Sequence, residues 1–183
     1  HLGKKCEIGN FKKKRGSIET RPVSGDYVAR LLHDYRGKRQ LRVAWDPGNG
    51  ASGEILCKLV EKLPGEHFLI NQEIDGTFPG HHPDPTIEAN LVQLRDLVFK
   101  KDCELGIAFD GDGDRIGVID SRGNVLWGDQ LLVIFAREVL IECPGSTIIS
   151  DIKASQVFSD EIRRLGGNPV LWKAGHSHIK TKM

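Results

Sequence analysis

The segment Leu41-Arg-Val-Ala-Trp-Asp-Pro-Gly-Asn-Gly50 places a strand pattern directly before a turn pattern. Its first five residues are mostly apolar or aromatic, as in a buried strand, and the Pro and Gly residues after Asp46 are those that turns favour. Residues 51–63 have the apolar spacing of a helix, and residues 67–71 have that of a second strand. This order predicts a β-α-β unit and therefore an α/β fold.

The same alternation of elements continues toward the C-terminus. Residues 87–100 predict a helix, residues 105–109 a strand, and residues 116–127 a hairpin around the turn at Arg122-Gly123. A second cycle follows, with helix 129–141, strand 147–150, helix 155–165 and strand 169–172. The pattern predicts two consecutive three-layer α/β units with mixed, mostly parallel sheets, which meet near residues 120–128.

The first 37 residues are expected to precede these two units. Residues 1–20 hold few apolar side chains, and Lys12-Lys-Lys-Arg15 is typical of a solvated tail or connector, with a basic phosphate-binding patch as the alternative. A helix then follows, with Ser24 or Asp26 as its N-cap and Gly37 as its stop. Its apolar face is formed by Tyr27, Val28, Leu31, Leu32 and Tyr35.

Composition argues against several classes of function. The chain has 26 Lys and Arg against 25 Asp and Glu, so its net charge of +1 gives no overall field to attract nucleic acid or an anionic membrane. Its apolar stretches are too short to span a bilayer, and its first residues lack the apolar core of a signal peptide. We therefore expect a cytoplasmic protein. The four cysteines are widely spaced without a C-x-x-C pair, which indicates reduced thiols, mostly in the core.

The acidic motif Asp110-Gly-Asp112-Gly-Asp114-Arg115 follows the predicted strand 105–109. Three carboxylates separated only by glycine repel one another unless a cation lies among them, and glycine lets the backbone curl so that all three reach one ion. Oxygen ligands without His or Cys suit Mg²⁺ or Mn²⁺. We therefore expect a Mg²⁺ site with positions left for water or a phosphate oxygen.

Two other interpretations fit this acidic spacing less well. An EF-hand calcium loop also opens with D-x-D-x-D, but it needs Gly at its sixth position and Glu at its twelfth, where this chain has Arg115 and Ser121. The flanking segments also predict strands, whereas an EF-hand has helices. A solvated acidic turn without a ligand is the remaining alternative, and the apolar strand before it argues against that.

This loop and two further segments resemble the α-D-phosphohexomutase family, which comprises phosphomannomutases and phosphoglucomutases. D-G-D-G-D-R at residues 110–115 is similar to the family's metal loop. Residues 73–85 are similar to its D-G-x-F-P-x-x-x-P-x-P segment, and Trp172-Lys-Ala-Gly-His-Ser177 resembles its sugar-binding loop. The three segments occur in the family's order, and the resemblance extends over residues 46–183.

The resemblance implies a division into domains and a reaction. Residues 1–37 would be a tail and helix left from domain 1, residues 38–122 domain 2 with the metal loop, and residues 123–183 a truncated, sugar-binding domain 3. The parent enzyme would interconvert hexose 1-phosphate and hexose 6-phosphate through a phosphoserine and a bisphosphate intermediate. Its partners would be mannose or glucose phosphate, the matching bisphosphate and the remaining domains of the parent chain.

The resemblance also implies roles for single residues. Mg²⁺ would be held by the three aspartates, and Arg115 and Lys153 would be catalytic; without the resemblance, Lys153 is more simply an exposed loop lysine. The substrate-binding set would be Arg115, Lys153, Lys173, Gly175, His176 and Ser177, although His178 departs from the apolar residue expected there. Because these loops follow strand ends, Arg115, Lys153 and His176 are expected to line one cleft with the aspartates.

Other motifs leave alternatives open. Gly48-Asn-Gly50-Ala-Ser-Gly53 satisfies the dinucleotide-binding pattern G-x-G-x-x-G after a strand, and Glu73 lies at the distance such a site requires. However, Asp46 places a carboxylate where a pyrophosphate needs donors. A non-catalytic module that binds metal or a phosphosugar is the other alternative. His81 and His82, which lie between prolines, are assigned to loop structure rather than to a metal.

Two loops of the family do not occur in these 183 residues: the T-A-S-H-N-P-type loop with the catalytic serine and the R-x-S-G-T-E-P-type loop of domain 4. The chain also begins without Met and ends inside a predicted helix. It is therefore expected to be an internal fragment that has no mutase activity by itself.

Overall fold

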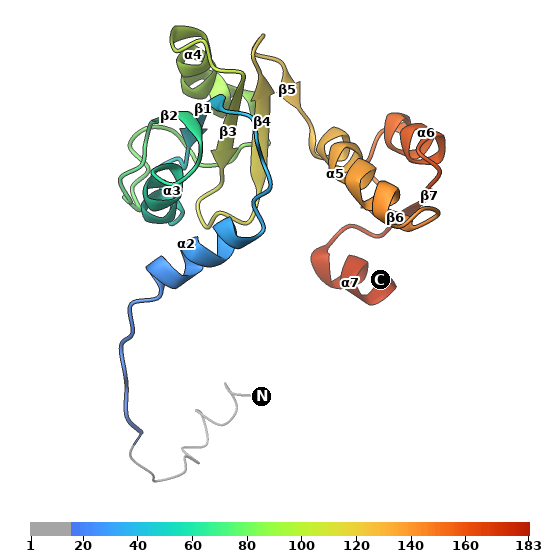
Figure 1. The fold of residues 1–183 in the computed structure, drawn as a ribbon, viewed down its shortest axis with the longest axis horizontal. Helices are drawn as coiled ribbons and strands as arrows, with labels where there is room; N and C mark the ends of the chain where they lie inside the picture. Colours follow the sequence, from blue (N-terminus) through green and yellow to red (C-terminus); the bar gives the residue numbers. More distant parts are fainter. Residues whose placement is uncertain (1–15) are drawn as a thin grey trace.

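The computed structural model describes residues 16–183, which form the two α/β units shown in Figure 1. The strands of the first unit are β1 (Leu41–Asp46), β2 (Gly65–Leu69), β3 (Leu105–Phe109), β4 (Ile116–Asp120) and β5 (Val125–Leu126), in the order β2-β1-β3-β4-β5. β1 pairs in parallel with β2 and β3, whereas the β3–β4 and β4–β5 pairs are antiparallel. Its helices are α2 (Ser24–His33), α3 (Gly53–Val60), the 3-10 helix η1 (Glu88–Leu91) and α4 (Val92–Lys100). The predicted β-α-β unit and hairpin are both present.

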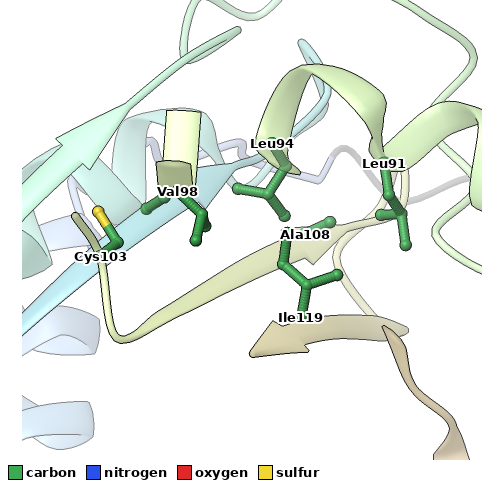
Figure 2. Close-up of a cluster of buried hydrophobic side chains, with 7 residues drawn as sticks. Leu91, Leu94, Val98, Cys103, Ala108 and Ile119 are labelled. Carbon is green, nitrogen blue, oxygen red and sulfur yellow. The ribbon is translucent and has the colours of Figure 1, made fainter. Parts of the chain in front are cut away.

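Alternating side chains of β1 belong to two different cores. Val43 and Trp45 are buried on the face of the sheet that packs against α3. Ala44 belongs to the cluster on the opposite face. Figure 2 shows Leu94 and Val98 of α4 in this cluster, beside Ala108 of β3. Because the side chains of a strand point alternately to its two sides, one short apolar run contributes to both layers of helices.

The second unit is built on a parallel pair of strands. Its elements are α5 (Gly128–Glu142), β6 (Thr147–Asp151), α6 (Gln156–Arg164), β7 (Asn168–Trp172) and α7 (His176–Lys182). β6 and β7 pair with Ile149 opposite Val170, and Phe158 and Ile162 of α6 are fully buried in a cluster with residues of α5 and β6. The predicted α/β fold class, with mixed and mostly parallel sheets, is confirmed.

Helix α2 packs against α3, and both of its ends differ from those expected. Neither Ser24 nor Asp26 is the N-cap: the helix begins at Ser24 without a side-chain cap and ends at His33, before Gly37. The Ser24 hydroxyl instead accepts a hydrogen bond from Lys58 Nζ of α3 at 2.8 Å. A tertiary contact has therefore replaced the local cap that the sequence suggested.

Several other expectations can be checked on the described residues. The helix predicted at residues 51–63 spans only Gly53–Val60, because the residues before it form part of a turn. Cys103 is buried, and burial raises the pKa of its thiol. Cys57 is partly buried and Cys143 is exposed, so a core location is wrong for Cys143.

The basic run at residues 12–15 lies outside the described residues. Within residues 16–183, no helix is both long and apolar enough to cross a membrane.

Candidate metal and sugar-phosphate sites

Three aspartates converge in the loop between β3 and β4. Asp110 directly follows β3 and is buried, whereas Asp112 and Asp114 are exposed. Each carboxylate offers one oxygen to a group in which all the oxygens lie within 4.8 Å of one another. Gly113, at a φ of +74°, allows the tight turn in which its N–H donates to the Asp110 carbonyl at 3.1 Å. The loop thus brings the three expected metal ligands together.

The chemistry of this acidic loop fits a bound cation. Repulsion from Asp112 raises the pKa of Asp114, and a cation held among the three carboxylates would relieve that repulsion. A set of carboxylate oxygens without nitrogen or sulfur suits a hard divalent ion such as Mg²⁺. The residues that would hold Mg²⁺ are Asp110, Asp112 and Asp114.

Arg115 is turned toward two carboxylates of the first unit. Its Nε donates to Asp110 Oδ2 at 2.7 Å, and its Nη1 donates to Asp84 Oδ1 at 3.2 Å. Burial alone would raise the pKa of Asp110, but hydrogen bonds from the backbone and side chain of Arg115 lower it. Half of the Arg115 side chain remains exposed. The guanidinium is therefore fixed in orientation yet accessible to an anion.

The glycine-rich turn after β1 packs against the acidic loop. The Ala51 N–H donates to the Gly111 carbonyl at 2.9 Å. A Cβ at any of the three glycines would collide with another segment: the closest atoms are the Gly111 oxygen for Gly50 (2.7 Å), Pro83 Cβ for Gly48 (2.9 Å) and the Gln72 oxygen for Gly53 (2.1 Å). Contacts within the chain therefore account for the whole G-x-G-x-x-G pattern, and the dinucleotide alternative gains no support from it.

The buried carboxylate of Asp46, at the end of β1, contacts His81 in the segment 79–85, which contains three prolines. Asp46 is 1% exposed, and its Oδ2 lies 2.8 Å from Nε2 of His81. Its Oδ1 accepts hydrogen bonds from the Gly48 N–H at 2.9 Å and from Asn71 Nδ2 at 3.1 Å. His81 thus has a loop-forming role, as expected. This role of Asp46 was not predicted, and its only signal in the sequence is a carboxylate placed directly after an apolar strand.

The second unit contains a cavity of about 600 Å³ beside the predicted sugar-binding residues. Lys153, Gly175 and His176 line this cavity, whereas Lys173 and Ser177 are exposed and do not. Gly175 has a φ of +116°, a conformation in which a side chain would be strained. The structure thus gathers three of the expected substrate-binding residues around one space.

The acidic loop does not line this cavity, and a single cleft shared by the two stays a prediction. Neither Arg115 nor the three aspartates are among the described residues that line the cavity, and Thr86 is the one lining residue from the first unit. The hairpin of β4 and β5 runs between the acidic loop and α5 (Figure 1). Thr86 donates through its N–H and hydroxyl to Asp84, at 3.0 and 2.7 Å, and Asp84 also pairs with Arg115. The two sites are therefore linked through this turn.

The loop that carries Lys153 is held by two aspartates. The Lys153 N–H donates to Asp151 Oδ1 at 2.7 Å, and the N–H and hydroxyl of Ser155 donate to Asp129 Oδ2 at 2.9 and 2.6 Å. Burial alone would raise the pKa of Asp129, but the hydrogen bonds from Ser155 lower it. Because Asp129 lies in the first turn of α5, this contact joins the Lys153 loop to that helix.

Each of the two units matches the model of a known protein family. The phosphoglucomutase/phosphomannomutase α/β/α domain II model matches residues 25–123, and the α/β/α domain III model of the same family matches residues 127–183. This chain belongs to the phosphoglucomutase/phosphomannomutase family. The domain II match contains the acidic loop, and the domain III match contains nearly all the residues that line the cavity. The resemblance inferred from the three sequence segments is confirmed.

Members of the family from several bacteria are similar to this chain. A phosphomannomutase/phosphoglucomutase of Pseudomonas syringae pv. tomato is 42% identical over 182 residues, which cover 100% of this chain and 39% of the relative. A phosphoglucomutase of Neisseria meningitidis serogroup A is 38% identical over 170 residues, which cover 93% of this chain and 37% of the relative. A crystal structure of a family protein from Burkholderia thailandensis matches with a TM-score of 0.91 and 39% identity, over 99% of this chain and 40% of that one. The chain thus spans about two fifths of the length of these family members.

Proposed function

We propose that this chain provides the cation-binding domain and part of the sugar-binding domain of a phosphohexomutase, whose whole chain interconverts hexose 1-phosphate and hexose 6-phosphate. The observation that carries the proposal is the convergence of Asp110, Asp112 and Asp114, with oxygens within 4.8 Å of one another, directly before Arg115. Relatives named phosphomannomutase/phosphoglucomutase support the reaction class. The proposed reaction passes through a phosphoserine and a bisphosphate intermediate.

Mg²⁺ is the proposed cofactor, with the three aspartates as its ligands. When bound, it would supply positive charge that neutralises a phosphoryl group during transfer. Arg115 is the proposed catalytic residue of the same loop, because a guanidinium can donate two hydrogen bonds to a phosphate. Its bonds to Asp110 and Asp84 hold it in place before a substrate arrives, which supports this role.

The cavity of the second unit is the proposed sugar-phosphate site. Its volume of about 600 Å³ lies within the ordinary range for small-molecule sites. Lys153 is proposed to be catalytic and to bind phosphate, His176 to donate to a hydroxyl or phosphate, and Gly175 to allow close approach of the sugar. Lys173 and Ser177 are proposed as further ligands from the exposed loop. The proposed substrates are mannose or glucose phosphate and the matching bisphosphate.

We also propose the division into domains given by the sequence, with residues 38–122 as domain 2 and residues 123–183 as domain 3. The two family matches, which meet between residues 123 and 127, support the boundary. β5 lies on the domain 3 side of this boundary, although it is hydrogen-bonded to β4 in the first sheet. The domain II match begins at residue 25 and so includes helix α2, which the proposed division leaves with residues 1–37 as a remnant of domain 1. A cytoplasmic location is proposed for the parent enzyme.

A cation titration tests the observation on which this function depends. Calorimetry with Mg²⁺ and Mn²⁺ should show binding to the chain that is lost or strongly weakened by Asp112→Asn. The matched control is Asp96→Asn on α4, which removes the same charge from an exposed residue outside the acidic loop. Equal affinity of the wild type and Asp112→Asn would contradict the metal assignment.

A second titration tests the sugar-phosphate site independently. Glucose 1,6-bisphosphate, added in the presence of Mg²⁺, should shift the NMR resonances of Lys153, Gly175 and His176. Resonances of the exposed turn at Arg122 should stay unchanged. Shifts confined to other parts of the chain would contradict the assignment of the cavity while leaving the cation site intact.

A further inference from the structure

Ser52 carries a buried hydroxyl that lacks a hydrogen-bond partner among the residues that the structure describes. It occupies the N-cap position of α3, where a serine hydroxyl ordinarily accepts a hydrogen bond from an N–H of the first turn. Here the side chain makes no such cap bond. Buried hydroxyl groups in native proteins are nearly always paired, so an unpaired one calls for an explanation.

The position of Ser52 connects it to the acidic loop. The adjacent Ala51 donates its N–H to the Gly111 carbonyl at 2.9 Å. A Cβ built on Gly113 would lie 3.2 Å from Ser52 Cβ and 3.8 Å from Ser52 Oγ, so the two residues are in close contact. Ser52, Asp112 and Gly113 also line one cavity of about 370 Å³ between α2, α3 and the end of β3. Ser52 and the proposed cation ligand Asp112 therefore border the same cavity.

We propose that Ser52 is a positioning residue for the divalent cation: its hydroxyl donates to the carboxylate oxygen of Asp112 that does not bind the ion. A carboxylate has two oxygens, and one held on a cation leaves the other free to accept a hydrogen bond. Such outer contacts orient metal ligands, and their loss typically lowers metal affinity 10- to 100-fold. This inference rests on the proposed function, because it concerns the same cation site.

The test is Ser52→Ala, followed by two measurements on the 183-residue chain. Titration with Mg²⁺ and Mn²⁺ should show affinity lowered by about tenfold or more. Thermal unfolding without metal should show a Tm no lower than that of the wild type, because Ala removes a buried hydroxyl that has no partner there. A serine that served only the fold would give the opposite pattern, with a lower metal-free Tm and unchanged affinity.

Two further variants complete the experiment. Ser52→Thr keeps the hydroxyl and should restore most of the affinity, whereas Ser24→Ala, on the neighbouring helix α2, should leave it unchanged. Equal affinity of the wild type and Ser52→Ala would overturn the role of Ser52 and leave the cation site standing. Absence of Mg²⁺ and Mn²⁺ binding in the wild type would overturn the cation site, and this proposal with it.

Discussion

The carboxylate of Asp110 accepts two hydrogen bonds from Arg115, one from the backbone N–H at 2.9 Å and one from Nε at 2.7 Å. The first bond closes the loop through the main chain. The second places a positive charge beside three carboxylates that would otherwise repel one another. Arg115 therefore stabilises the acidic loop through both its backbone and its side chain.

Removing the Arg115 side chain should lower the stability of the chain but raise its affinity for a cation. In Arg115→Ala, thermal unfolding without metal should show a lower Tm, because the charged hydrogen bond to Asp110 is gone. Mg²⁺ should bind about twofold to fivefold more tightly by calorimetry, since a neighbouring positive charge has been removed. Arg122→Ala, at an exposed turn, is the control. Weaker Mg²⁺ binding by Arg115→Ala would contradict this electrostatic account.

The contact between Asp129 and Ser155 should make the second unit sensitive to acid. The pKa of Asp129 is lower in the folded chain than the usual value of about 3.9, so its contribution to stability is complete above about pH 5. That contribution is lost as the pH falls through the folded pKa, because protonation weakens the bonds from Ser155. Measured between about pH 3 and pH 7, the Tm of Asp129→Asn should fall less steeply with acid than that of the wild type. Parallel curves would show that this contact has no such effect.

Two glycines offer a matched pair for testing the packing of the turn after β1. A Cβ at Gly53 would lie 2.1 Å from the Gln72 oxygen, whereas one at Gly76 meets no atom within 4 Å. Gly53→Ala should therefore destabilise the chain by about 1–3 kcal/mol in chemical unfolding, since the backbone must shift. Gly76→Ala should change the stability by less than about 0.5 kcal/mol. Similar effects of the two substitutions would contradict the packing role given to Gly53.

These 183 residues should show no mutase activity, even with the acidic loop intact. They contain no T-A-S-H-N-P-type loop, so no serine of that loop is present to carry the phosphoryl group between the two oxygens. Placing a nucleophile correctly is worth about 7–11 kcal/mol of the barrier. The measurement is a coupled assay on mannose 1-phosphate or glucose 1-phosphate, with Mg²⁺ and a catalytic amount of the matching bisphosphate. Turnover by the homogeneous chain would show that the catalytic apparatus has been misplaced.

The sequence predicted those features of the fold that depend on neighbours along the chain. The apolar run of β1, bounded by Asp46-Pro47, predicted both the strand and the turn, and the hairpin followed from Arg122-Gly123. The N-cap of α2 was predicted wrongly because the Ser24 hydroxyl bonds to Lys58 of another helix. Propensity describes a local segment, and a tertiary contact can override it.

The contacts of the candidate site were likewise predictable only where the residues lie close together in the sequence. The convergence of the aspartates was predictable because Asp110, Asp112 and Asp114 lie within one short loop whose glycines allow it to curl. The contact between Asp46 and His81 joins residues 35 apart, and no periodic pattern connects them. The position of the acidic loop relative to the cavity of the second unit depends on how that unit follows the first sheet. No single segment of the sequence contains that information.

The hairpin of β4 and β5 connects the acidic loop to the second unit. It begins directly after Arg115 and leads into α5, where Asp129 holds the loop of Lys153. Because the pair is antiparallel, with Val118 opposite Leu126, the end of the hairpin next to Arg115 lies beside the end that leads into α5. Residues added at the exposed tip should therefore leave the two ends in place, whereas a one-residue slip of β5 against β4 would move the side chains of β5 to the opposite faces of the sheet.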